Sequence, residues 1–276
     1  MREKKLIKLF KVLGIIFLLI FCLAPFVWMI FISLNKNPDF LSPQTGFALT
    51  LNNYFEVATS DKFHLWNYLI NSLVVSIASA LLATLFASFS AYSITRLKFT
   101  GRIIIPIMLL GFSMFPQIAI VGYLFEMITD FGWLNTYAAL IFPYITLGLP
   151  LALWIMLSYF SQLSTELDRA ALIDGANRLQ ILFKIILPLA LPALFSTFML
   201  TLIYSFNEFL FALMLTTDYH GRTIPVGIAL FEGLHGQIPW GYIMAAAVIA
   251  VIPVLILVAL FQKYVIHGLI EGAVKG

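Results

Sequence analysis

The sequence predicts an all-α, polytopic membrane protein that crosses the bilayer six times. Hydrophobic residues make up 62% of its 276 residues, charged residues only 11%, and the mean hydropathy is +1.00. Soluble domains carry roughly 25% charged residues, so a soluble globule could not cover its surface with this composition. Apolar runs on the order of 20 residues, long enough to cross a bilayer, recur along the chain.

The first apolar run follows a short basic segment, 1–11, and is too long for the core of a signal peptide, which spans about 7 to 15 residues. We therefore expect an uncleaved first span within one transmembrane domain, 1–276. The single cysteine, Cys22, permits no disulfide within the chain. The six spans are expected at about 12–34, 69–95, 103–128, 137–160, 183–215 and 241–264.

The distribution of basic residues predicts how the chain is oriented. Of 16 Lys and Arg residues, 13 lie in the two terminal segments, the 96–102 connection or the 161–184 loop. The remaining three are Lys36, Lys62 and Arg222. By the positive-inside rule both termini are cytoplasmic, whereas 35–68 and 216–240 are external. Because the net charge of +3 is scattered over short loops, we expect membrane lipid and no nucleic acid as a contact.

A stripe of small residues marks the second span. Ser79, Ala83, Ala87 and Ala91 recur every four positions and therefore share one helical face. Small side chains let helices approach closely in lipid, so the stripe predicts helix packing.

A charged island, 164–191, interrupts the apolar runs. Thr165, with Asp168 three positions later, can cap a short helix that begins at Glu166. Leu167, Ala170, Ala171 and Asp174 then form one narrow, mostly small face of that helix.

The end of this short helix is also encoded locally. Gly175 suits the left-handed residue that commonly ends a helix. Asn177 and Gln180 can cap a second helix, which we expect to continue through KIILP into the fifth span. A helix of about nine residues is marginal alone in water. The short helix is therefore either a docking element for another protein or an ordinary capped loop.

The island resembles a known motif. ELDRAALIDGA and the later ILP at 186–188 are similar to the EAA motif of the membrane subunits of bacterial binding-protein-dependent ABC importers. AYSITRLKFTGR, FGWLNTYAALIFPY, SFNEFLFALMLTT and the C-terminal segment extend the resemblance over roughly 50–276, specifically to the carbohydrate-type permeases.

In this family the cytoplasmic EAA helix sits in a cleft of an ATP-binding subunit and passes its motion to the spans. The resemblance assigns Ala170, Ala171, Asp174 and Gly175 to the motif, with Glu166 and Leu167 just before it. Arg169 stands where the family usually has the glutamate of EAA, and Ser164 where it often has proline.

The chain contains no Gly-Lys dipeptide, hence no phosphate-binding P-loop, so the ATPase must be another polypeptide. The resemblance implies a heterodimer with a second homologous permease subunit, two ATP-binding cassette subunits that hold ATP-Mg, and an extracytoplasmic solute-binding protein. No cofactor is expected on this chain itself. The implied location is the bacterial cytoplasmic membrane, and the implied solute is a sugar or oligosaccharide. A glycerol-phosphate or polyamine importer is the alternative.

Asn207 and Glu208 are the sharpest polar signal inside a predicted span, since an ionisable group at membrane depth tends to face a cavity or a polar partner. They are candidates for the translocation path or a gate; a structural contact between helices is the other interpretation. We expect no catalytic residues and no metal site, because no histidine pair has metal-binding spacing and no GxSxG motif occurs. A passive channel and an intramembrane hydrolase are the alternatives of another class.

Overall fold

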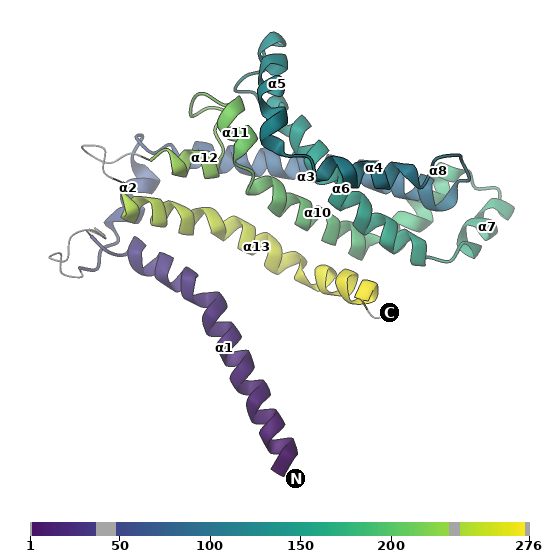
Figure 1. Ribbon diagram of the computed structural model, residues 1–276, viewed down its shortest axis with the longest axis horizontal. Coiled ribbons are helices and arrows are strands. Elements are labelled where there is room, and N and C mark those ends of the chain that lie inside the picture. The colour runs from purple at the N-terminus through teal and green to yellow at the C-terminus, as the bar shows by residue number, and fades with distance from the viewer. Residues whose placement is uncertain (1, 37–47, 232–237, 274–276) are drawn as a thin grey trace. The chain divides into compact units, whose positions relative to one another are not determined.

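The computed structural model describes residues 2–36, 48–231 and 238–273. Regular structure in these ranges is helical, apart from one isolated bridge between Asn35 and Leu49, which confirms the all-α class (Figure 1). The helices are α1 (Arg2–Ser33), α2 (Asn52–Thr59), α3 (Leu65–Arg96), α4 (Ile104–Ser113), α5 (Gln117–Asp130), α6 (Tyr137–Gln162), α7 (Glu166–Ile173), α8 (Arg178–Ile181), the π-helical η1 (Leu182–Ile186), α9 (Leu187–Leu189), α10 (Leu191–Phe206), α11 (Leu210–Leu215), α12 (Ile224–Ala229) and α13 (Trp240–Ala273).

Four helical stretches in the described residues are unbroken and apolar enough to cross a membrane: Ile7–Ser33, Leu65–Arg96, Tyr137–Gln162 and Trp240–Phe261. They cover the first, second, fourth and sixth predicted spans. Two further pairs of helices pass the same test only when each pair is joined across a sharp bend. The described part of the chain therefore has four candidate spans, or up to six if each bent pair is one span.

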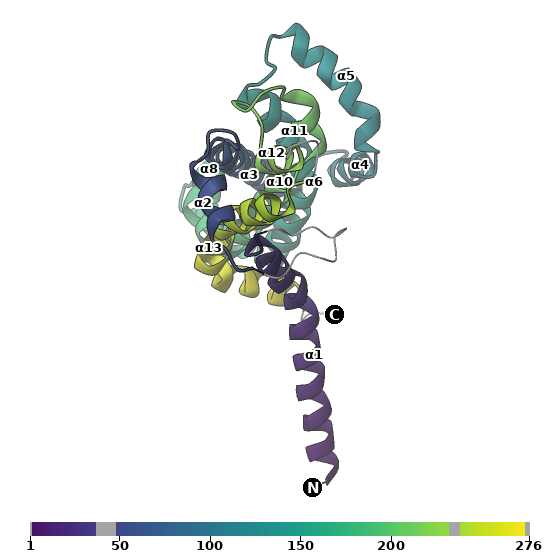
Figure 2. The same cartoon turned by 90° about the vertical axis from the view of Figure 1, so that its left-hand side faces the viewer.

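The third predicted span, 103–128, is divided into α4 and α5, which meet at 92° (Figure 2). Pro116 has an extended backbone at this break, with φ −66° and ψ 121°. Proline has no N–H to continue the helical hydrogen bonds, so α4 ends before it and α5 begins after it.

The fifth predicted span, 183–215, also differs from a straight helix. The helix capped by Asn177 and Gln180 runs through KIILP as expected, but residues 178–189 lie at 79° to α10, so it does not continue straight into the rest of the span. Pro188 and Pro192 flank the bend at Ala190, and Pro192 lacks the N–H that would bond across it to the carbonyl of Pro188. Before the bend, the N–H of Leu187 donates to the carbonyl of Leu182, five residues back, in a π-helical turn.

The chain forms two compact units, 66–226 with 253–276, and 1–65 with 227–252. In the first unit α3, α6 and α10 run side by side (Figure 1). The small-residue stripe of α3 is fully buried there, which confirms its packing role. A Cβ on Gly148 of α6 would lie 2.7 Å from Cγ2 of Thr201 in α10 and 3.9 Å from Cβ of Ala83 in α3. Glycine is required where these three helices meet.

The second unit contains α1, α2 and the first part of α13. Nδ2 of Asn53 donates to the carbonyls of Ser33 and Asn35, at 2.8 and 2.9 Å, and so holds α2 against the end of α1. Phe63 packs against the rings of Phe231 and Tyr242. Most of α1 is exposed, because only 6% of its most apolar 18-residue stretch is buried within this chain.

Candidate functional site

The loop 164–190 forms a short helix, a turn and a second helix, as the sequence predicts. Helix α7 begins at Glu166. The predicted cap is wrong, because Thr165 itself has a helical backbone and its hydroxyl accepts no capping bond. Instead, Oγ of Ser164 accepts a bond of 3.2 Å from the N–H of Glu166, and Asp168 turns away from the helix start to contact Arg96.

The turn after α7 is confirmed residue by residue. Gly175 has φ +84°, the left-handed conformation in which a side chain would be strained. Asn177 and Gln180 form a complete capping box, since each side chain accepts the other residue's N–H at 2.9 Å. The Gly175 turn and the capping box therefore end α7 and begin α8 at defined residues.

The face of α7 that the sequence predicts as a docking face is divided by the structure. Ala171 is only 7% exposed and belongs to the protein's own apolar core, with Tyr92, Phe160 and Ile181 among others. Leu167, Ala170, Asp174 and Gly175 are exposed. Ala171 therefore packs inside the chain and leaves little surface for a partner, a feature that the sequence pattern did not predict.

Two apolar residues that the sequence pattern missed stand on the open side of α7. Ile173 is 86% exposed and Leu172 is also exposed. Exposed aliphatic side chains on a short polar helix are unfavourable in water. They complete the surface of Leu167, Ala170, Leu172, Ile173 and Asp174, which we call the α7 surface.

A buried ion pair holds α7 to the end of α3. Nε of Arg96 lies 3.1 Å from Oδ2 of Asp168, and their side chains are 4% and 6% exposed. Nη2 of Arg96 also donates to the carbonyl of Leu163, at 2.9 Å, and the Tyr92 hydroxyl donates to Oδ1 of Asp168 at 3.4 Å. Arg96 thus connects the ends of α3 and α6 with the first turn of α7.

The other ion pair of α7 is of a different kind. Nη1 of Arg169 lies 2.7 Å from Oε1 of Glu166, and both side chains are about 70% exposed, at 70% and 71%. Where the family motif has a glutamate, this chain therefore has a cation paired within its own helix. Exposed pairs at this spacing stabilise a helix only slightly.

Asn207 and Glu208 lie where the membrane-spanning path of α10 breaks before α11. The buried Glu208 carboxylate accepts the N–H of Phe211 at 2.9 Å and that of Ala212 at 3.2 Å, which caps α11. Asn207 is exposed, and its Nδ2 donates to the carbonyl of Ile203 within α10. A broken helix frees backbone groups that need such partners at membrane depth.

The break at Glu208 is joined to the break between α4 and α5. Nε2 of Gln117, the first residue of α5, donates to the hydroxyl of Tyr204 in α10, at 3.1 Å. The buried Tyr144 of α6 packs in the same apolar cluster as Phe211 and Ala212 of α11. The two helix breaks are therefore neighbours in the fold, although the bonded residues Gln117 and Tyr204 are 87 positions apart in the sequence.

At the opposite end of α3 a network of neutral groups holds the loop 216–224, and sequence analysis did not find it. Nδ2 of Asn71 donates to the carbonyls of His220 and Arg222 at 2.8 and 2.9 Å. Oδ1 of Asn71 accepts from the Tyr137 hydroxyl at 2.9 Å, and Oγ of Ser72 accepts from the N–H of Ile224 at 2.7 Å.

Asn135 fixes the same loop from the α5–α6 connection. Its Oδ1 accepts the N–H of Thr217 at 2.6 Å, and its Nδ2 donates to Oγ1 of Thr217 at 2.7 Å. Asn135 has φ +61°, a conformation that asparagine tolerates better than most residues. We call Asn71, Ser72 and Asn135 with their bonds the amide node.

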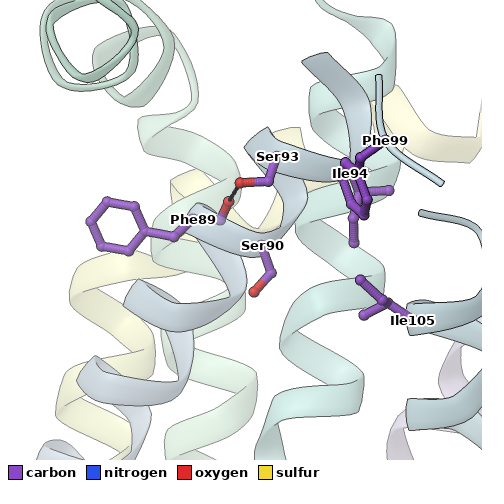
Figure 3. Close-up of a pocket in the computed structure, with 6 residues that line it drawn as sticks. All are labelled: Phe89, Ser90, Ser93, Ile94, Phe99 and Ile105. Atoms are coloured by element: carbon purple, nitrogen blue, oxygen red, sulfur yellow. Dashed lines mark hydrogen bonds between the residues drawn. The ribbon is translucent and has the colours of Figure 1, made fainter. Parts of the chain in front are cut away.

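A hollow of about 240 Å³ opens beside the last turns of α3. Figure 3 shows Ser90 and Ser93 of α3 on one side and Ile105 of α4 on the other. The Ser93 hydroxyl is occupied by a bond to the carbonyl of Phe89, at 2.9 Å, which leaves a mainly apolar lining.

The arrangement of helices defines the class of protein. The chain aligns with a TM-score of 0.75 to the crystal structure of a bacterial ABC transporter involved in the import of the acidic polysaccharide alginate, over 96% of this chain and 98% of that chain. The sequence identity is 20%, so this likeness shows the fold, which is that of an ABC transporter permease.

Residues 83–271 match the family described as binding-protein-dependent transport system inner membrane component. The chain belongs to this family, and the resemblance found in its sequence is confirmed.

Named relatives carry the comparison to full length. The chain is 53% identical over 277 residues to the trehalose/maltose transport system permease protein MalG of Thermococcus litoralis, covering 100% of both. It is 35% identical to the trehalose transport system permease protein SugB of Mycobacterium tuberculosis, over 93% of each chain. It is 36% identical to the sulfoquinovosyl glycerol permease SmoH of Agrobacterium fabrum, over 94% of this chain and 91% of that protein. These relatives are permease subunits of transport systems.

Proposed function

We propose that this chain is the membrane subunit of an ATP-driven importer for trehalose, maltose or a closely related short sugar. The observation that carries the proposal is the full-length identity of 53% to a trehalose/maltose permease. Two further relatives that carry sugars or a sugar derivative in their names support the same class of solute. Hydrolysis of ATP-Mg then takes place on two separate ATP-binding subunits.

The α7 surface is the place where an ATP-binding subunit docks. Burying its exposed aliphatic side chains, above all Ile173, in a cleft of another protein lowers the free energy of the complex. Glu166 and the exposed residues of the family motif surround them, and Gly175 sets the angle at which the helix projects. Ala171 contributes from the inside, by seating α7 on the core.

The complete importer contains a second homologous permease subunit and an extracytoplasmic solute-binding protein. The mostly exposed apolar face of α1 supports contact with lipid or with the second permease subunit. The charge distribution supports cytoplasmic termini and a cytoplasmic 161–184 loop. In a Cys22→Ser background, a cysteine at Arg178 should resist an impermeant thiol reagent in intact cells, and modification there would contradict this orientation.

Glu208 belongs to a gate on the translocation path. A break in a membrane-spanning helix is tolerated where it is buried in protein or lines a cavity, and a carboxylate caps this one. Glu208→Gln retains the shape but leaves one oxygen to accept two N–H groups. We expect normal insertion with altered uptake kinetics for radiolabelled trehalose and maltose; wild-type kinetics would count against the assignment.

The test of the docking proposal compares two substitutions in one helix. Ile173→Glu places a charge on the exposed side of α7, so the protein should fold and insert while association with the ATPase subunit and sugar uptake are both lost. Ala171→Glu places a charge in the apolar core and should lower the stability of the protein itself. Leu51→Glu, at an exposed leucine before α2, is the matched control and should change neither the association with the ATPase subunit, nor sugar uptake, nor the stability of the protein.

Normal ATPase association and normal uptake in Ile173→Glu would refute the docking surface. A wild-type protein that conducts sugar without any ATPase subunit would instead favour a passive channel and refute the importer.

A further inference from the structure

The Arg96–Asp168 pair is a buried ion pair whose presence is not explained by stability of packing alone. It is buried, it joins residues from two helices far apart in sequence, and it lies at the base of α7. Placing two charges in an apolar interior costs free energy that their attraction does not always repay, so apolar side chains of similar size would often stabilise a fold better. A role other than stability is therefore worth testing.

The connection between α7 and the spans passes through few side chains. In α7 only Asp168 and Ala171 are buried, and the other six residues are exposed. Ala171 offers a single methyl group to the core. Asp168 contacts both Arg96 and Tyr92 of α3, so it is the larger of the two attachments.

The geometry of the pair suits a contact that persists while helices shift. Nε of Arg96 and Oδ2 of Asp168 are 3.1 Å apart, but neither atom has a partner with hydrogen-bond geometry, so the contact is ionic rather than directed. Charge attraction falls only with the inverse of distance and is weakly screened when buried. Apolar contacts, in contrast, lose much of their energy within about 1 Å.

The local fields keep both charges in place. Asp168 lies in the first turn of α7, near the positive end of that helix dipole. Arg96 lies in the last turn of α3, near the negative end. Each charge is favoured at its own helix terminus. Arg96 additionally binds the carbonyl of Leu163, where α6 ends.

We propose that the Arg96–Asp168 pair transmits movement of the docked α7 to the membrane-spanning α3 and α6. Arg96 and Asp168 are positioning residues. They touch neither ATP nor sugar, and they act by making α3 and α6 follow α7. This inference rests on the proposed function, since it requires an ATPase subunit on the α7 surface.

The test uses the complete transporter, purified with its ATPase subunits and reconstituted in proteoliposomes with its solute-binding protein. ATP hydrolysis, uptake of radiolabelled trehalose and maltose, and thermal unfolding are measured for each variant. The principal variant is Arg96→Met with Asp168→Leu, which replaces the pair with apolar side chains. Both residues are changed together because Arg178, whose positive charge acts on Tyr92, would attract the Asp168 carboxylate if Arg96 alone were removed.

We expect the double variant to assemble with ATPase subunits and to hydrolyse ATP within about twofold of wild type, while sugar taken up per ATP falls about tenfold. The melting temperature should not fall. Arg96→Lys, which retains the charge but loses the fork that reaches Leu163, should show an intermediate ratio and decides the matter if the double variant does not express. Arg102→Met, at an exposed cation in the next loop, is the control and should retain the wild-type ratio.

A wild-type ratio of sugar to ATP in the Arg96 variants would overturn the proposal. Loss of the ATPase subunit together with uptake would also overturn it, because the pair would then only hold α7 in shape. Failure of the proposed function is distinguishable from both, since the wild-type protein itself would then purify without an ATPase subunit or without ATP-dependent uptake.

Discussion

The two ends of α3 are held in contrasting ways. At its start, the loop 216–224 is bound by the amide node, whose own three side chains are neutral: Asn71 alone makes three hydrogen bonds, from both atoms of its amide. At its end, the side-chain polar contacts of α7 with α3 are one ionic contact and a weak hydroxyl bond beside it, in addition to the packing of Ala171. Neutral directed bonds from several atoms fix one geometry, since each weakens steeply with angle. An ionic contact holds two elements together over a range of geometries.

The difference teaches that the fold can be rigid at one end and adjustable at the other without any change in helix packing between them. The close approach of α3, α6 and α10 at Gly148 supports this, because well-packed helices transmit displacement rather than absorb it. The adjustable end carries α7, and its ionic contact keeps α7 attached to α3 while the angle between them changes, so that α3 still follows α7.

The largest expected effect comes from breaking the amide node. Asn71→Ala removes three hydrogen bonds at once and leaves two carbonyls and the Tyr137 hydroxyl without their partner. We expect a loss of about 2–4 kcal/mol of stability, because unsatisfied part-buried groups cost about 1–3 kcal/mol each and water reaches some of them. Thermal unfolding of the purified protein measures it. Asn52→Ala, at an exposed asparagine, is the control and should stay near zero.

A smaller loss should follow when the packing between the two ends is disturbed. Gly148→Val introduces a Cβ that would lie 2.7 Å from Cγ2 of Thr201, so α6 and α10 must separate. Overpacking of this kind costs about 1–3 kcal/mol. Gly122→Ala, where no atom lies within 4 Å of the added Cβ, should be neutral or slightly stabilising in the same unfolding measurement. Equal effects in both glycine variants would argue against close packing at Gly148.

Asn135→Gly sharpens the comparison within the amide node. Glycine adopts the backbone conformation of Asn135, with φ +61°, without strain, so the substitution removes only the side-chain bonds to Thr217 and Asp218. Because these bonds are exposed, we expect a cost of about 1 kcal/mol. Hydrogen exchange of the 216–224 amides should rise. Unchanged exchange there would show that Asn71 and Ser72 hold the loop without Asn135.

The smallest effect is expected at the exposed ion pair of α7. Arg169→Ala removes a pair whose side chains are about 70% exposed, at 70% and 71%, and should change stability by less than about 0.5 kcal/mol. The difference in unfolding midpoint between this variant and the wild type should stay small at low and at high salt. A loss comparable to that of the Asn71 variant would contradict the distinction between exposed and buried contacts.

The features that sequence analysis predicted correctly are those set by neighbours along the chain. The start of α7, the Gly175 turn, the Asn177–Gln180 cap and the buried stripe of α3 all depend on spacings of four residues or fewer. Helical periodicity groups Ala171 with Leu167, but it contains no information on which face meets the protein's own core. That is why the spacing did not reveal that Ala171 packs into the protein's own core.

The features that were missed depend on long-range contacts. Asn71 meets His220 across 149 residues, and Tyr92 meets Asp168 across 76. The prolines of the third and fifth predicted spans were visible, but their bends of 92° and 79° are set by the packing around them. Asn207 and Glu208 stood out as polar residues in a span, whereas the helix break that explains Glu208 could not be read from their identity.

The most direct test of the account asks which loop touches the ATPase subunit. In a Cys22→Ser background, Ile173→Cys on the α7 surface and His220→Cys on the loop held by the amide node are each crosslinked in the assembled transporter with a short thiol-to-amine reagent. Both side chains are exposed, so reactivity alone does not separate them. If the ATPase subunit docks on the α7 surface, we expect a crosslink to it from position 173 and none from position 220. A crosslink from position 220, with none from position 173, would contradict it.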